Sequence, residues 1–239
     1  MEKIYWTRES VKFLEDIARN NNKEWFAENK SVYDNAIVIP AKRFVEDMGN
    51  ELKKIIPAIS YAPKIDGSIF RIYKDARINK GKAPYKTHLG IVFWEGHSRL
   101  ESSCFYFHIE PPFYFSGVGM ARFSAEILAE YRKSLNNKNE LAELAAIKKD
   151  AEKRYYEFKG EKLKNIPKGF EALNKDGEDF LKYKTLYLND ETPINNDFYS
   201  PELFNGVLAS FKNMLPYHKW LSRIIKRAED KKNAENNNI

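Results

Sequence analysis

The chain has 239 residues, of which 43% are hydrophobic, and a formal net charge of +6 at pH 7. This composition is sufficient for a packed core and indicates a folded, globular protein. The single cysteine, Cys104, excludes an internal disulfide bond and a zinc site built on several thiolates. Because no signal peptide and no stretch of 18 consecutive apolar residues is recognisable, the sequence predicts a cytoplasmic protein without a membrane span.

Helical spacing dominates the first quarter of the chain. Thr7 fits the N-cap of a helix that ends at Asn20–Asn22 and turns four apolar residues inward: Val11, Phe13, Leu14 and Ile17. A second helix is expected from about Lys23. Pro40 either kinks that helix or stands in the first turn of a third one, whose inner face carries Phe44, Val45, Met48, Leu52 and Ile55.

The pattern then changes to short aromatic and β-branched runs, which predict strands of a mainly antiparallel sheet. The expected strands are residues 69–73, 88–94, 104–109 and 113–115. The run from Cys104 to Glu110 alternates most clearly. It places Phe105, Phe107 and Ile109 on a core face and Tyr106, His108 and Glu110 on a wet or functional face.

Helices are expected again at residues 121–135 and 141–156, followed by an irregular stretch and a short strand at residues 185–188. Ser200 and Pro201 favour a helix start, and Pro216 is expected to open the last helix. The sequence therefore predicts one α+β domain over residues 1–228, with a central antiparallel sheet between N-terminal and C-terminal helices. Residues 229–239 are almost entirely polar and are predicted to form a disordered tail.

The most informative segment runs from Arg71 to His88, RIYKDARINKGKAPYKTH. It holds six Lys or Arg residues and one Asp, a net charge of +5, so the remaining 221 residues are nearly balanced. Cations gathered this closely repel one another unless carboxylates, carbonyls or a bound anion neutralise them. Read as strand, loop and strand, the segment predicts a hairpin that binds an anionic ligand. The predicted ligand-binding residues are Arg71, Lys74, Asp75, Arg77, Lys82, Tyr85 and Lys86.

A structural interpretation competes with this one, in which distant carboxylates neutralise Arg71 and Arg77 in an internal network. The pocket is favoured because Asp75 is the one acid within the segment, where it is expected to orient an arginine. His88 and His108 are the candidate catalytic residues, as general acids or bases beside bound phosphate.

Other chemistry receives less support from the sequence. The two histidines, Asp75 and Glu110 include metal-binding residue types, but no His-x-His, HExxH or paired-carboxylate spacing occurs among them, and no metal site is predicted. The run Ser116–Met120, SGVGM, precedes an expected helix and either offers backbone N–H groups to an anion or forms a simple tight turn. Cys104 is expected to be inert core.

The basic segment resembles the signature R-x-x-R-D-x-R-F-x-x-x-K-x-P-Y-K of DUF2461, a bacterial family of unknown function. Lys74 stands where that signature has Arg, which loses a bidentate fork, and Ile78 stands where it has Phe. The remaining matched residues are Arg71, Asp75, Arg77, Lys82, Pro84, Tyr85 and Lys86. Three further runs are similar to segments of that family: FLEDIARNNNKEWFAENKSVY, SGVGMARF and IPKGFEALNKDGEDFLKYK. The resemblance covers approximately Val11 to Leu188 and implies a single domain without naming an activity.

Two functions follow as hypotheses from the residues. The first is a protein that binds a phosphate-bearing or other anionic small molecule, as an enzyme if His88 or His108 transfers protons. The second is a non-catalytic nucleic-acid-binding module in which Tyr73, Tyr85 or Tyr106 stack on bases. The compact anion site is favoured over nucleic acid because the rest of the chain is nearly neutral and offers no extended basic track. A third hypothesis is that the cations bind an acidic peptide of a partner protein. The sequence specifies neither a cofactor nor an oligomeric state.

Overall fold

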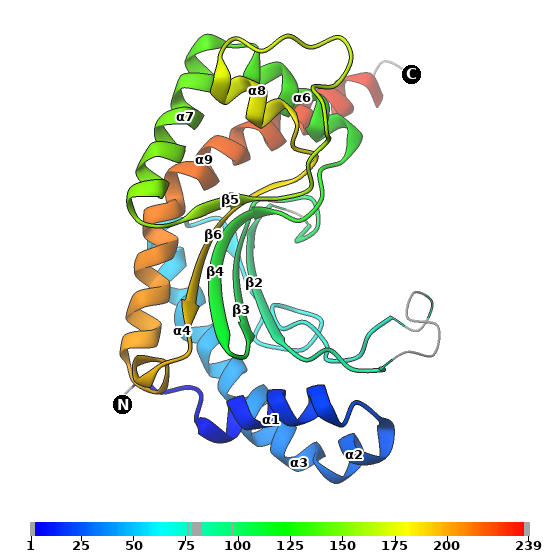
Figure 1. Cartoon of the computed structure of the whole chain (residues 1–239), viewed down its shortest axis with the longest axis vertical. Helices are drawn as coiled ribbons and strands as arrows, with labels where there is room; N and C mark the ends of the chain where they lie inside the picture. The colour runs from blue at the N-terminus through cyan, green and yellow to red at the C-terminus, as the bar shows by residue number, and fades with distance from the viewer. Residues whose placement is uncertain (1–2, 76, 78–82, 97, 237–239) are drawn as a thin grey trace. The chain divides into compact units, whose positions relative to one another are not determined.

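The computed structural model describes residues 3–75, 77, 83–96 and 98–236 (Figure 1). It has the predicted α+β fold, with a six-stranded antiparallel sheet in the order β1-β2-β3-β4-β6-β5. In chain order the strands are β1 Ile59–Ser60, β2 Leu89–Glu95, β3 Cys104–Glu110, β4 Phe113–Met120, β5 Glu157–Lys159 and β6 Leu186–Pro193. The helices before the sheet are α1 Arg8–Arg19, α2 Lys23–Glu28, α3 Lys30–Val32, the π-helix η1 Tyr33–Val38 and α4 Ile39–Ile55. The later helices are α6 Ala125–Leu135, α7 Lys138–Lys153, α8 Lys175–Leu181, the 3₁₀ helix η2 Asn196–Tyr199 and α9 Glu202–Asn236.

The chain forms two compact units. The first contains residues 1–93, 106–116 and 191–210, and the second contains residues 94–105, 117–190 and 211–239. The expected organisation as one domain over residues 1–228 stays a prediction. The basic segment and both candidate catalytic histidines belong to the first unit.

Figure 1 shows the N-terminal helices of the first unit, whose buried residues follow the apolar spacing of the sequence. The backbone N–H of Thr7 donates to Ser10 Oγ at 3.0 Å at the start of α1, whose Phe13, Leu14 and Ile17 are buried. Pro40 lies in the first turn of α4, directly after the π-helical turn η1. The second of the two expected roles for Pro40 matches this position, although the backbone before it is already helical in η1, so the proline lies within a continuous helical run.

Strands β2 and β3 begin and end within one residue of their predicted bounds. Residues 69–73, by contrast, form no strand. Ile69 bridges Ile91 of β2, whereas Tyr73 bridges Tyr85, so the backbone changes partner after a few residues and builds no continuous ladder. The isolated bridges still fix both ends of this segment in place.

The run Ser116–Met120 forms the end of strand β4. Its two glycines had suggested a turn before a helix, which the structure does not have at this position. A Cβ atom on Gly119 would lie 2.6 Å from the carbonyl oxygen of Leu186, and this glycine has φ +146°. Its lack of a side chain therefore permits close approach to β6, and the prediction of an anion-binding turn is wrong.

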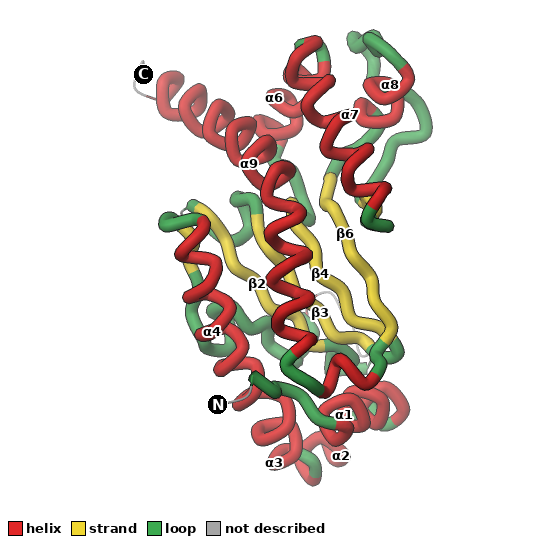
Figure 2. The backbone as a smooth tube through the Cα atoms, turned by 90° about the vertical axis from the view of Figure 1, so that its left-hand side faces the viewer, coloured by secondary structure: helices red, strands yellow, loops and turns green. Residues whose placement is uncertain are grey.

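In the second unit, α6, α7 and α8 pack beside one another (Figure 2). Helix α9 begins next to the predicted Ser200–Pro201 start but runs through Pro216, where a new helix was expected. Its inward residues Phe211, Met214, Tyr217 and Trp220 are buried on both sides of the proline. We attribute the continuity to this packing, which offsets a proline cost of about 3 kcal/mol.

Helix α9 also extends beyond the boundary that composition placed at residue 228. Residues 229–236 continue the helix, and Lys231 in this part forms an ion pair with the buried Glu130 of α6. A helix needs no apolar residues of its own where local hydrogen bonds and such a contact hold it. Among the helices of the described residues, none combines the length and apolar character that crossing a bilayer requires.

Candidate functional site

The ends of the basic segment pair with each other as two arms through an isolated bridge, where the sequence predicted a strand, a loop and a return strand. The backbone N–H of Lys74 donates to the Pro84 carbonyl at 2.9 Å, and that of Lys86 donates to the Ile72 carbonyl at 2.7 Å. Tyr73 and Tyr85 face each other between these bonds. Lys82 was predicted to bind ligand and lies outside the described residues, as does most of the connecting loop.

Tyrosines occupy one face of the two arms. The Tyr85 ring stacks on Phe26 of α2 at a centroid distance of 4.3 Å, and Tyr73 contacts both rings from the rim of this cluster. The Asn21 side chain holds the outer edge: its amide nitrogen donates to the Tyr85 carbonyl at 3.0 Å and its oxygen accepts from the Tyr85 N–H at 2.9 Å. Tyr85 is 3% exposed and serves the core, so we leave it out of the proposed site.

Lys74 and Lys86 fall on the opposite face of the arms. Side chains alternate along extended backbone, so the residues on either side of a bridged pair share the face that the pair does not use. Lys86 Nζ donates to the Arg71 carbonyl at 2.9 Å and lies 5.5 Å from the centre of the Phe70 ring. The pairing therefore gathers two of the predicted ligand-binding cations on one side.

The two predicted arginines differ in their surroundings. Asp75 accepts two hydrogen bonds from the Arg77 guanidinium, at 3.0 and 2.7 Å, and one from the Arg77 backbone. These bonds lower the pKa of Asp75 to about 2, with smaller contributions from the charges of Arg77 and Arg71. Arg71 is exposed, and among the described residues no carboxylate lies within ion-pair distance of it. Asp75 thus orients Arg77 and leaves Arg71 available.

The two candidate catalytic histidines meet in space. His88 lies directly before β2 and His108 lies in the adjacent strand β3, and their ring centroids are 4.4 Å apart. His108 is 6% exposed and stacks on Phe115 of β4 at 4.2 Å. Its Nδ1 shares a hydrogen bond of 2.8 Å with the Tyr106 hydroxyl, and its Nε2 lies 3.3 Å from Glu110 Oε2.

Burial sets the protonation of this group. The pKa of His108 is lowered to about 4 by burial. The pKa of His88 is also lowered to about 4, first by burial and then by His108, Lys86 and Lys74, against an opposing effect of Glu110. Burial likewise raises the pKa of the Tyr106 phenol. At neutral pH both imidazoles are therefore uncharged, and each has a ring nitrogen with a lone pair.

Gly90 makes room for this arrangement. A Cβ atom at Gly90 of β2 would lie 2.5 Å from the Tyr106 hydroxyl oxygen and 3.2 Å from the Phe70 ring. The absent side chain lets the phenol cross the neighbouring strand and reach His108.

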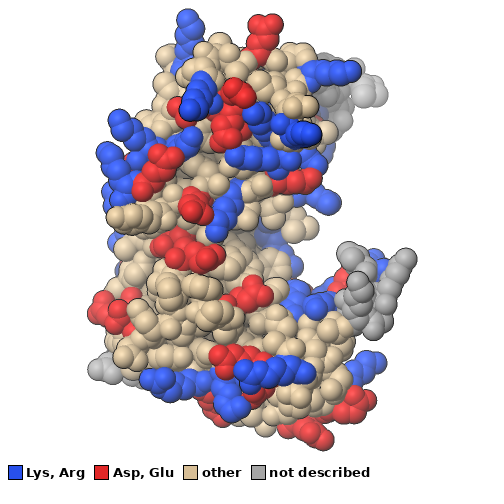
Figure 3. All heavy atoms as spheres, viewed as in Figure 1, with Lys and Arg blue, Asp and Glu red and all other residues tan. Residues whose placement is uncertain are grey.

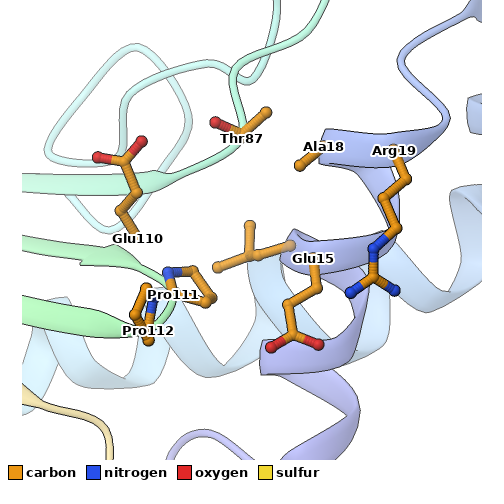
Figure 4. A pocket seen from close by; sticks show the side chains of 8 residues that line it. Glu15, Ala18, Arg19, Thr87, Glu110, Pro111 and Pro112 are labelled. Carbon is orange, nitrogen blue, oxygen red and sulfur yellow. The ribbon is translucent and has the colours of Figure 1, made fainter.

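Figure 4 shows a pocket of about 470 Å³ that is lined by Glu110, a member of the histidine cluster. Glu15 and Arg19 line it from α1, and Glu110 lines it from the end of β3. Thr87, which precedes His88, also borders it; the remaining lining residues are Leu14, Ala18, Pro111 and Pro112. Glu110 therefore belongs both to the histidine cluster and to an open volume.

The second unit contains a group that sequence reasoning missed. Both ring nitrogens of His218 in α9 form hydrogen bonds of 2.8 Å, Nδ1 with Ser103 Oγ and Nε2 with Glu95 Oε2. Ser103 is 1% exposed, so no substrate reaches its hydroxyl, and the group is structural. The signal was present: His218 falls at the inward helical spacing of Phe211, Met214 and Leu221.

Cys104 is buried, as expected for a core residue, and burial raises the pKa of its thiol to about 12. A thiol in this state is a poor nucleophile.

The comparisons with known proteins give one positive result. Neither the curated proteins nor the solved structures contain a match to this chain. A family model described as "Conserved hypothetical protein (DUF2461)" matches residues 9–220, which includes the basic segment, the histidine cluster and most of α9. The match confirms the resemblance found in the sequence and extends it toward both ends. The chain therefore belongs to the DUF2461 family.

Proposed function

We propose that the protein binds a small anionic ligand, such as a phosphate-bearing molecule, on the face of the basic arms that carries Lys74 and Lys86. The observation that carries the proposal is the backbone pairing of residues 72–74 with residues 84–86, because it directs both lysines away from the tyrosine cluster. Lys86 also donates to the carbonyl of Arg71, so the backbone of this exposed arginine lies beside the lysine. Several cations within one short segment favour a ligand with two or more negative charges.

The surroundings of the lysines support a bound ligand more than an internal network. The charges of both lysines act on His88, where they help to lower its pKa, so they lie close to a half-buried group. The network interpretation fits Arg77, which Asp75 already neutralises. It does not fit Arg71, for which the described residues supply no acid within ion-pair distance. We therefore centre the proposed site on Arg71, Lys74 and Lys86.

The pocket beside Thr87 and Glu110 supports a small molecule as the ligand. Its volume of about 470 Å³ suits a metabolite of modest size. Because Glu15 and Glu110 line it and Arg19 is its one lining cation, the pocket alone does not attract an anion. We infer that the anionic group binds at the lysines and that the remainder of the ligand extends toward this volume.

Nucleic-acid binding is the alternative function, and one observation favours it. Tyr73 is 50% exposed beside the cations, as a base-stacking residue would be. Tyr85 stacks on Phe26, and the Tyr106 hydroxyl is bonded to His108. Of the three tyrosines considered for base stacking, Tyr73 is therefore the one that remains available. On the face drawn in Figure 3, the Lys and Arg side chains of the described residues are intermixed with Asp and Glu. A compact anion site accounts for more of these features.

Thermal unfolding with candidate ligands tests the proposal. A panel of inorganic phosphate, pyrophosphate, sugar phosphates, nucleotides and short oligonucleotides is added to the full chain. A ligand at 100 times its dissociation constant stabilises by about 2.7 kcal/mol, or roughly 5–10 °C. Arg71→Ala and Lys74→Met should remove this shift, whereas Lys12→Met, which changes an exposed lysine of α1, should keep it.

The outcomes separate the two functions. Stabilisation by one small phosphate compound that survives moderate salt supports the proposed site. Binding of oligonucleotides alone, with a steep loss of affinity as salt rises, supports the alternative. If no anion stabilises the protein, or if Arg71→Ala unfolds it without ligand, the cations are structural and the proposal is wrong.

A further inference from the structure

We propose that His88, His108 and Glu110 bind a divalent first-row transition-metal ion such as Zn²⁺, Co²⁺ or Fe²⁺. The ligand atoms of these three residues all lie within 4.8 Å of one another. Two imidazoles and one carboxylate form a donor set that such ions accept with open coordination positions. The inference concerns a cation and does not depend on the anion site proposed above.

The spacing is close to that of an assembled site. Metal–nitrogen and metal–oxygen bonds of about 2.0–2.2 Å place two ligand atoms roughly 3 to 4 Å apart. His108 Nε2 and Glu110 Oε2 already have this separation, at 3.3 Å. Separations of up to 4.8 Å between the ligand atoms can shorten when Glu110 changes rotamer, because its side chain is half-exposed. His108 stays fixed between Tyr106 and Phe115.

Tyr106 supplies the contact that a metal-binding histidine needs at its other nitrogen. Histidine ligands generally donate their second ring N–H to an oxygen, which fixes the tautomer and the ring orientation. With an ion on Nε2 of His108, the Tyr106 oxygen would accept from Nδ1–H. Without an ion, the contact with Glu110 fits Nε2–H as the donor and a Tyr106 hydroxyl that donates to Nδ1, so metal binding exchanges the tautomer while both partners stay in place. Gly90 in turn leaves room for the Tyr106 phenol, so neighbouring residues support the ligand orientation.

Charge decides how tightly the ion is held. Glu110 contributes one negative charge, whereas Lys74 and Lys86 are the cations that act on His88. These lysines oppose a second positive centre, which predicts modest affinity for the metal alone. Because Glu110 lines the pocket, the open coordination positions of the ion are accessible to water or to a small ligand.

Metal titration of the full chain tests the inference. The protein is stripped with a chelator and titrated with Co²⁺, whose visible absorption reports nitrogen and oxygen coordination, and with Zn²⁺ by calorimetry. We expect one equivalent to bind. Glu110→Gln and His88→Ala should each weaken binding at least tenfold. Glu15→Gln is the matched control, because Glu15 is exposed and lines the same pocket without a histidine beside it.

Each result bears on the inference. Saturable binding that Glu110→Gln and His88→Ala weaken, and that Glu15→Gln preserves, supports it. The absence of Co²⁺ absorption, or binding that survives both ligand variants, overturns it. Glu110→Gln alters a half-exposed side chain and keeps the fold testable if His88→Ala does not fold. A protein that binds Co²⁺ but responds to no phosphate compound would retain this inference and lose the proposed function.

Discussion

The Tyr106 hydroxyl and His108 Nδ1 are 2.8 Å apart, and the bond between them lies over Gly90 of the adjacent strand. Tyr106 and His108 project from the same face of β3, two residues apart, and Glu110 continues that row. One strand therefore contributes an orienting phenol, an imidazole and a carboxylate in order. The histidine cluster depends on this row and on the neighbour that leaves space for it.

Substitution of Gly90 by alanine should disturb the cluster. The new methyl group would lie 2.5 Å from the Tyr106 oxygen, and a rigid ring cannot move away without breaking its bond to His108. We expect a loss of about 1–3 kcal/mol in the free energy of unfolding, measured by urea denaturation. Gly206→Ala is the control, because a Cβ atom there meets nothing within 4 Å and helix propensity should add up to about 1 kcal/mol. Equal stability of both variants would contradict the expected crowding.

Removal of the Tyr106 hydroxyl should weaken the proposed metal site without removing a ligand. In Tyr106→Phe, His108 loses the partner that fixes its tautomer, which predicts a fall in Co²⁺ affinity of about 10- to 100-fold. Tyr73→Phe changes an exposed phenol and should leave the affinity unchanged. A stability loss in Tyr106→Phe with unchanged Co²⁺ affinity would assign the hydroxyl a structural role only.

Replacement of Lys86 should affect the two proposed ligands in opposite directions. Lys86→Met keeps the apolar stem but removes the charge that acts on His88. The stabilisation by phosphate compounds should decrease, while the affinity for Co²⁺ should rise roughly fivefold, or about 1 kcal/mol, as repulsion is relieved. Thermal unfolding and Co²⁺ titration of one sample measure both effects. A decrease in both affinities would mean that Lys86 mainly supports the local fold.

Ser103 should behave as a structural residue and not as a nucleophile. Ser103→Ala leaves the buried His218 Nδ1 without its partner, which should cost about 1–3 kcal/mol of stability by urea denaturation. The wild-type protein should form no adduct with a fluorophosphonate, a reagent for activated serines. Labelling at Ser103 would refute the structural assignment of this group.

Glu95 should make stability depend on pH in the acidic range. The hydrogen bond from His218, followed by the charge of His218 and a bond from Ser222, lowers the pKa of Glu95 below its ordinary value of 4.5. The stabilisation is therefore present above pH 4.5 and is lost as pH falls through the lower, folded-state pKa. Between pH 6 and pH 3, Glu95→Gln should lose less free energy of unfolding than the wild type. Ser222→Ala, which removes a longer bond of 3.4 Å, should show an intermediate effect.

Local sequence signals predicted the helices and strands in which buried residues recur with the regular spacing of that element. Phe13, Leu14 and Ile17 marked the inner face of α1, and the alternation at Phe105 and Phe107 marked the core face of β3. Pro216 and the run Ser116–Met120 were misread because their local preferences were overruled by tertiary contacts. Helix packing carries α9 through the proline, and strand packing explains the glycines of β4.

The candidate residues were named from the sequence, but their association was not. His88 and His108 are 20 positions apart and meet because β2 and β3 are neighbours in the sheet, which spacing rules within one element do not detect. The absence of a metal site was predicted from such spacing alone. For the same reason, sequence could not indicate that Asp75 would engage Arg77 and leave Arg71 available, because that choice depends on local backbone geometry.

Asn21 closes the outer edge of the basic arms at Tyr85. An unpaired strand edge presents free N–H and C=O groups that recruit strands from other molecules and nucleate aggregates. At Tyr85 both outward groups are already satisfied by the Asn21 amide, which imitates the peptide unit of an additional strand. An asparagine between two helices thus occupies the backbone groups that an additional strand would need at this position.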